Sequence, residues 1–196
     1  MTINKYLLNE YDVIELGSSI GIVSSYIRKR THQNRQLICV EANPSLLDII
    51  GKNIYKNTQS GNFKIINKPI SYTKSIVPFK ISLSNNTDSH AASDETQIHG
   101  ALDKIIELPS IQLNKILSEF NIKEYVLVSD IEGAEIEILL YDTDSLTHCK
   151  QIIAELHTIN YMNKLYAPSD MQILIEALGF VLQSKHGFVY NFIKKN

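Results

Sequence analysis

The segment DVIELGSSIG, residues 12–21, decides the fold. Its first half, Asp12 to Leu16, is a short apolar run of the kind that forms a buried strand. Gly17 and Gly21 then allow a tight turn, and apolar residues recur at helical spacing from Ile20 to Ile27. A strand, a glycine turn and a helix in this order predict the first unit of an α/β fold.

The alternation of strands and helices continues along the chain. Gln36–Glu41 is a second apolar strand, Pro44 opens a second helix, and Phe63–Asn67 is a third strand. Further strands are predicted at 125–130 and 151–157, helices at 112–120 and 168–178, and a two-stranded hairpin within 180–193. Such alternation is typical of parallel sheets with right-handed crossovers. The sequence therefore predicts a Rossmann-like α/β fold, with a mainly parallel seven-stranded sheet, a C-terminal antiparallel hairpin strand and helices on both faces.

A less regular region separates the third strand from the strand at 125–130. Val77–Leu83 alternates like an extra strand, and residues 105–110 have the pattern of another. Residues 84–100 are polar, lack periodicity and exceed the usual length of an internal connection. This pattern predicts either a lid or substrate loop, or a surface segment that is disordered. No change of composition marks a second domain, so we expect residues 1–196 to form a single domain.

Composition disfavours several classes of function. The chain has 19 Lys and Arg against 21 Asp and Glu, so it lacks the basic field that favours nucleic-acid binding. A small-molecule or glycan acceptor fits better. There is no signal-peptide pattern and no run of about 20 apolar residues, and Cys39 and Cys149 lack disulfide or zinc spacing. We expect a cytoplasmic protein with no membrane partner, and so small a core is compatible with a homo-oligomer.

The turn after the first strand has the chemistry of a ligand site. An acidic residue precedes the pattern GxxxG, whose glycines bring backbone N–H groups close to a ligand. This pattern differs from the GxGxxG that seats a pyrophosphate, so it favours a ligand without phosphate there, such as S-adenosylmethionine. Glycines in this place also serve helix packing alone, and both readings stand. The residues concerned are Glu15, Gly17, Ser18, Ser19 and Gly21.

A second acidic residue, Glu41, ends the next strand about two dozen positions after the glycines. There a carboxylate can accept hydrogen bonds from both hydroxyls of a ribose. Asn43 and Pro44 shape the turn beside it. A solvent-facing glutamate at a strand end is the alternative, but together with the glycine turn Glu41 favours nucleoside binding.

Four side chains able to move protons or hold cations follow the two later strands. Asp130 and Glu132 end the strand at 125–130, and alternation brings Glu155 and His157 to one side of the strand at 151–157. We expect Asp130, Glu132 and His157 to be catalytic in a site without metal, with His157 as a candidate general base. A divalent cation on these residues is the second reading. There are two structural alternatives. The acidic residues could cap a helix, and the histidine could simply be hydrogen-bonded at the end of the sheet.

Six motifs occur in an order and spacing that resemble the FkbM-type methyltransferases, from about Tyr11 to His157. They are ELGSSIG, VEANP, NKPIS, LPSIQLNKIL, SDIEGAEIEIL and IIAELH. The resemblance implies a class I methyltransferase fold that uses S-adenosylmethionine, often to O-methylate sugars or natural products. Its most specific part is DIEGAE, residues 130–135. Val128 departs from the family, which commonly has a lysine two residues before that aspartate, and this departure bears on substrate contacts and catalysis.

Matching positions carry the family's cofactor contacts onto this chain. The resemblance implies that Asp130, Glu132 and His157 surround the transferred methyl, with Asp130 also facing the cofactor, while the loop 84–100 approaches the acceptor. Three functions remain open: an O-methyltransferase acting on a sugar, glycan or small natural product, a cofactor-binding regulatory or scaffold protein without catalysis, and an RNA or protein methyltransferase. The implied cofactor contacts are Gly17, Ser18, Gly21, Glu41, Ala42 and Asn43, with Lys68, Pro69 and Ile70 near the adenine.

Overall fold

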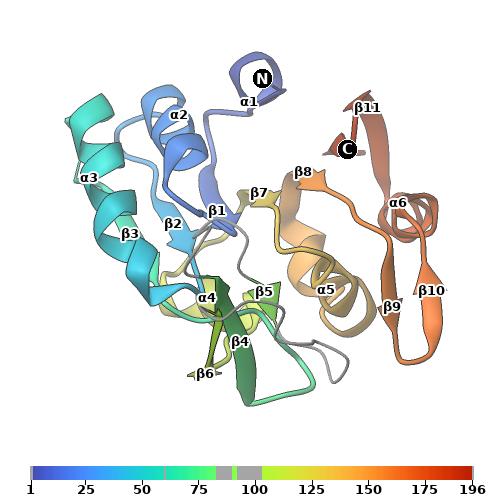
Figure 1. Ribbon diagram of the computed structural model, residues 1–196. Helices are drawn as coiled ribbons and strands as arrows, with labels where there is room; N and C mark the ends of the chain where they lie inside the picture. The colour runs from blue at the N-terminus through green and yellow to red at the C-terminus, as the bar shows by residue number, and fades with distance from the viewer. Residues whose placement is uncertain (1, 60, 83–89, 92–102, 196) are drawn as a thin grey trace.

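The computed structural model describes residues 2–59, 61–82, 90–91 and 103–195. At its centre lies a seven-stranded sheet in the order β11-β12-β8-β7-β1-β2-β3 (Figure 1). The strands from β8 to β3 run parallel, and β12 is antiparallel to both β8 and β11. The predicted sheet and its C-terminal hairpin are therefore confirmed. The bounds are β1 Asp12–Leu16, β2 Leu37–Val40, β3 Phe63–Ile66, β7 Tyr125–Ser129, β8 Cys149–Glu155, β11 Phe180–His186 and β12 Val189–Lys194.

Helices cover both faces of this sheet, as the sequence predicts. Side chains alternate along the strands, so that Val13 packs among α1, α2 and α3 while its neighbour Ile14 packs among α4, α5 and α6. The interior strands are buried on both faces, which is why they read as continuous apolar runs. Figure 1 shows α2 beside α3 and α5 beside α6. The bounds are α1 Thr2–Tyr6, α2 Ile22–Arg30, α3 Leu47–Thr58, α4 Leu113–Glu119, α5 Glu135–Tyr141 and α6 Pro168–Ala177, with short 3₁₀ turns at Pro44–Leu46 and Ser145–His148.

A small antiparallel sheet lies beside the end of β2. It consists of β4 Ile76–Ser82 between β5 His90–Ala91 and β6 Asp103–Pro109. Its buried side chains Phe79, Ile81 and Leu108 pack against Ala42. The strands predicted at 77–83 and 105–110 thus exist, and they form a sheet of their own. Apart from residues 90–91, the predicted loop 84–100 lies outside the described residues.

One hairpin is absent from the sequence prediction. Directly after His157, β9 Ile159–Tyr161 pairs antiparallel with β10 Lys164–Tyr166. In the described ranges, no helix combines the length and the apolar character needed to cross a membrane.

Arg28 secures the end of α2. Its side chain is buried, with 3% of its surface exposed. The guanidinium donates to the carbonyl oxygens of Thr31 at 3.1 Å, His32 at 2.5 Å, Arg35 at 2.6 Å and Asn62 at 3.0 Å. One cation therefore joins the last turn of α2 to the loops before β2 and β3.

Candidate active site

The carboxyl ends of β1, β2 and β7 are joined by backbone hydrogen bonds. The N–H groups of Gly17 and Ser18 both donate to the carbonyl oxygen of Val40, at 2.9 and 3.2 Å. The N–H of Asp130 donates to the carbonyl oxygen of Leu16 at 2.9 Å. The predicted cofactor turn and the predicted catalytic aspartate therefore lie side by side at one edge of the sheet, where parallel sheets bind their ligands.

Close backbone packing requires both glycines of the turn. Gly17 has a φ of +81°, and a β-carbon there would lie 1.9 Å from the carbonyl oxygen of Asp130. Gly21 has a φ of +77°, and its β-carbon would lie 2.8 Å from the Cα of Ile50 in α3. Both positions thus need glycine for packing. That these glycines also contact a ligand stays a prediction.

The buried residue Glu15 links the glycine turn to α2. Its side chain is 1% exposed and accepts hydrogen bonds from the hydroxyls of Ser18, at 3.2 Å, and Ser24. Its second oxygen, Oε1, has no hydrogen-bond partner among the described residues. Burial raises the pKa of this carboxyl to about 7, because the two hydroxyl contacts offset the loss of hydration only in part. Glu15 therefore carries a proton more readily than an exposed glutamate.

Glu41 joins the ends of β1 and β2. Oε2 accepts from the N–H of Ser19 at 2.8 Å, and Oε1 accepts from the N–H of Asn43 at 2.7 Å. Burial raises the pKa of Glu41, while these backbone bonds act in the opposite direction. The Asn67 side-chain amide fixes the chain here by donating to the carbonyl oxygens of Glu41, at 2.9 Å, and Ala42, at 2.8 Å. The Glu41 carboxylate is thus oriented by the N–H groups of Ser19 and Asn43, and its backbone is fixed by Asn67.

Pro69 and Ile70, predicted near the adenine, are buried. They lie in the segment that joins β3 of the large sheet to β4 of the small sheet. The N–H of Ile111 donates to the carbonyl oxygen of Pro69 at 2.9 Å, and Ile70 forms an isolated bridge with Ile111. The Ile70 side chain belongs to the core under α4, α5 and α6. Their contact with a cofactor stays a prediction.

A tight turn after β7 presents Asp130 and Glu132. Glu132 and Gly133 have φ angles of +56° and +97°. The buried Glu135 carboxylate holds this turn by accepting from the Ser129 hydroxyl at 2.8 Å and from the N–H groups of Ile131 and Gly133 at 2.9 and 3.0 Å. Glu135 therefore fixes the backbone of the motif, and Asp130 and Glu132 remain 53% and 58% exposed.

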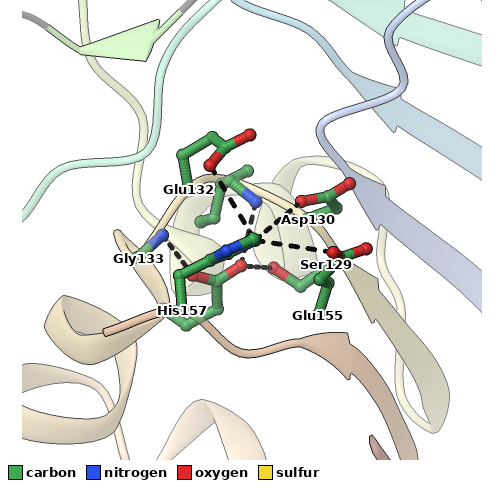
Figure 2. Close-up of polar contacts among 8 residues, drawn as sticks. Ser129, Asp130, Glu132, Gly133, Glu155 and His157 are labelled. Carbon is green, nitrogen blue, oxygen red and sulfur yellow. Dashed lines mark hydrogen bonds and ion pairs between the residues drawn. The ribbon is translucent and has the colours of Figure 1, made fainter. Parts of the chain in front are cut away.

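Figure 2 shows His157 facing three carboxylates. Its Nε2 lies 3.5 Å from Asp130 Oδ1, 3.8 Å from Glu132 Oε2 and 4.0 Å from Glu155 Oε1. Nε2 is enclosed and makes no hydrogen bond within the described part of the chain, and the ring stacks on Phe188 with centroids 6.4 Å apart. Burial, followed by the charge of Glu132, raises the pKa of Asp130, and His157 opposes this shift. The structure brings together the three residues predicted to be catalytic, while their roles stay predictions.

A cavity of about 470 Å³ opens between the sheet and the helices α1 and α2. This volume is within the range of small-molecule sites. Predicted site residues on its wall are Glu15, Gly17, Ser18, Ser19 and Asp130, and Val128 and Glu155 also line it. The other predicted site residues do not line it: Gly21, Glu41, Ala42, Asn43, Pro69, Ile70, Glu132 and His157. The cavity therefore reaches from the glycine turn to Asp130 and Glu155, and stops short of Glu132 and His157.

Two residues that shape the site are given no role by the sequence analysis, although Asn67 opens the motif NKPIS. Ser24 lies in the first turn of α2 and donates to Glu15, and Asn67 follows β3 and donates to the backbone around Glu41. A helical serine facing a strand glutamate is a weak signal. Only the fold brings each donor to its acceptor.

The fold and the arrangement of this edge define a Rossmann-like domain of the methyltransferase class. The family model described as the methyltransferase FkbM domain matches residues 15–195, so the chain belongs to the FkbM methyltransferase family. The resemblance stated from the sequence is confirmed, and the match continues past His157 through the C-terminal hairpin. A comparison with curated proteins finds no match.

Solved structures agree on the fold. The precorrin-6y C5,15-methyltransferase of Geobacter metallireducens has a TM-score of 0.51 at 12% identity, covering 98% of this chain and 84% of that one. The Methanococcus jannaschii fibrillarin pre-rRNA processing protein has a TM-score of 0.51 at 14% identity, covering 96% and 68%. An uncharacterised Listeria monocytogenes protein has a TM-score of 0.52 at 11% identity, covering 98% and 64%. At these identities the similarity establishes the fold alone.

Proposed function

We propose that this chain binds S-adenosylmethionine at the edge formed by β1 and β2 and methylates a hydroxyl oxygen of a sugar, glycan or small natural product. The observation that carries the proposal is the common position of two groups of residues. The turn from Gly17 to Ser19 and the cluster of Asp130, Glu132 and His157 occupy one sheet edge, and Asp130 lines the cavity beside that turn. The FkbM family membership supports the same reaction class.

The residues at β2 fit the ribose of such a cofactor. A carboxylate offers about four acceptor positions, and Glu41 uses one bond from Ser19 and one from Asn43. The Ala42 backbone also interacts with this carboxylate, which leaves acceptor capacity for a ribose hydroxyl. Ala42 next to it packs against the small sheet through Phe79 and Ile81, which provides an apolar wall at this end.

The chain's own contribution to transfer is positioning and proton removal. When bound, S-adenosylmethionine supplies a methyl group already activated on a sulfonium. The walls of the cavity exclude water and align the acceptor. His157 or Asp130 accepts the hydroxyl proton, and such general-base assistance is typically worth about 10²–10⁴-fold. The two side chains face each other, with 3.5 Å between Nε2 and Oδ1, which supports their pairing in this role.

Isothermal titration with S-adenosylmethionine and S-adenosylhomocysteine tests the proposal before any acceptor is known. Wild-type protein is expected to bind both ligands saturably, and Glu41→Gln is expected to weaken binding because it replaces two acceptor oxygens with one. Glu119→Gln, an identical change at an exposed position on α4, is the matched control. Absence of binding by the wild type would overturn the proposal. A transfer assay over glycans and hydroxylated metabolites then tests the acceptor class.

Val128 favours a second candidate function, a cofactor-binding regulatory or scaffold protein without catalysis. This residue is 7% exposed and lines the cavity where the family commonly has a lysine. An apolar side chain there cannot donate to an acceptor or stabilise charge. Saturable cofactor binding with no transfer to any acceptor by the wild type, and transfer gained in Val128→Lys, would favour this candidate, whereas turnover by the wild type would exclude it.

A further inference from the structure

The cluster of Asp130, Glu132 and His157 has the geometry of a cation site. One donor atom from each residue lies within 4.8 Å of the other two. Two ligands bound to one ion at about 2.0–2.3 Å lie about 3 Å apart at a right angle and at most about 4.5 Å apart across the ion. The distances of 3.5 and 3.8 Å from His157 Nε2 to the two carboxylates are within this interval. The same separations are too long for good hydrogen bonds.

His157 Nε2 gives an independent indication. The side chain as a whole is 29% exposed, but this atom is enclosed from solvent, faces the carboxylates and makes no hydrogen bond with the residues that the structure describes. A buried imidazole nitrogen without a partner loses free energy, and its lone pair is a metal ligand when the ring is neutral. Stacking of the ring on Phe188 keeps that nitrogen turned toward the cluster.

The charge balance of the cluster favours a divalent ion. Asp130, Glu132 and Glu155 all lie within 4.0 Å of the same nitrogen, and within the described ranges their ion pairs run to His157. Three carboxylates around one histidine repel one another. A divalent cation at their centre removes most of that repulsion.

We propose that Asp130, Glu132 and His157 bind a divalent first-row transition ion, such as Mn²⁺, with Glu155 beside it. The imidazole ligand favours such an ion over Mg²⁺ or Ca²⁺, and the carboxylates are ligands common to both groups. Asp130 and Glu132 are more than half exposed, so positions on the ion remain open to oxygen atoms of an acceptor.

The role of the ion in catalysis rests on the proposed function. Two vicinal hydroxyls of a sugar-like acceptor would fill the open positions, which orients the acceptor and lowers the pKa of the hydroxyl to be methylated. With His157 and Asp130 both bound to the ion, neither is free to accept the proton as in the metal-free mechanism, and the hydroxyl proton passes instead to the Glu155 carboxylate. The inferred acceptor class is accordingly a vicinal diol.

Titration of metal-free protein with MnCl₂, followed by electron paramagnetic resonance of free Mn²⁺, tests the ion site without any methyl transfer. One saturable site per chain is expected, weakened about tenfold or more in Glu132→Gln and in His157→Ala. Glu119→Gln should bind as the wild type does. Circular dichroism establishes that each variant is folded, and because Glu132 is exposed its amide variant does not disturb the core.

The outcomes separate the ion site from the proposed function. A single Mn²⁺ site lost in Glu132→Gln supports the inference, and it does so even if S-adenosylmethionine fails to bind, in which case only the proposed function falls. Absence of Mn²⁺ binding, or binding of equal strength in Glu132→Gln, overturns the ion site. Saturable cofactor binding alongside that result would leave the proposed function standing with a metal-free cluster.

Discussion

Gly17 lies against the carbonyl of Asp130 so closely that a β-carbon on residue 17 would be 1.9 Å from that oxygen. The contact involves backbone on both sides, so no side chain can move away to relieve it. Gly17→Ala must therefore separate β1 from β7 at the edge that carries the site.

We expect Gly17→Ala to lower the free energy of unfolding by about 2 kcal/mol or more, measured by urea denaturation. Gly187→Ala is the matched control, because Gly187 also has a positive φ, +63°, but its β-carbon would meet nothing within 4 Å. That variant should lose only about 1 kcal/mol. Equal losses in the two variants would show that backbone conformation, and not the contact with Asp130, makes glycine necessary.

Arg28→Met should destabilise the protein by about 2–4 kcal/mol, because it leaves four backbone carbonyls without their charged donor. Lys29→Met, one position later on the exposed side of α2, removes the same charge and should change stability by less than about 0.5 kcal/mol. Thermal and urea unfolding of both variants distinguish a local structural role from an effect of net charge. Similar unfolding midpoints in the two variants would contradict the role given to Arg28.

Glu15 predicts a pH dependence of stability. Its pKa is about 7 in the folded protein against 4.5 for the free side chain, so the folded state binds more protons between these values. The contribution of Glu15 to the free energy of unfolding should be complete below about pH 4.5 and be lost as the pH rises through 7, by roughly 3 kcal/mol in total. Glu15→Gln stays neutral and should lack this component. Urea titrations at pH 5 and pH 8 measure the difference, and an equal change in both proteins would refute it.

His157→Ala should leave the affinity for S-adenosylmethionine within about twofold of the wild type and reduce turnover by about 10²–10⁴-fold. The reason is that His157 faces the acidic cluster, whereas the glycine turn and Glu41 are held by other contacts. His148→Ala, at an exposed position before β8, serves as the control. Titration and a transfer assay measure the two effects separately, and fully retained turnover would remove His157 from the mechanism.

Much of the fold follows from the sequence because interior strands of a parallel sheet have a strong apolar signal. The β9–β10 hairpin was missed for a local reason. Its two central residues, Met162 and Asn163, both have positive φ, as a two-residue hairpin turn commonly requires, but glycine is absent from them. The dipeptide Met-Asn is not one of the sequences that predict such a turn, such as Asn-Gly or Asp-Gly. The short strands on either side add little periodicity.

The candidate site was predictable in its residue types and only partly in its geometry. Spacing placed Asp130 and His157 at neighbouring strand ends, since the carboxyl ends of parallel strands share an edge. The sequence could not distinguish the buried glutamates that fix the two turns, Glu15 and Glu135, from those that remain exposed, such as Glu132. Burial decides between these roles, and it depends on packing between segments far apart in the chain.

The pairing of β1 has a consequence for the order in which the protein assembles. β1 meets β2 after a short crossover, so the half of the site around Gly17 and Glu41 can form from nearby residues. Asp12 pairs with Tyr125 only after a loop of more than 100 residues closes. Closing so long a loop costs entropy before the contacts of β7 compensate for it. A folding chain should therefore acquire the Gly17–Glu41 half first, and the acidic half only in the slow step that docks β7 and β8.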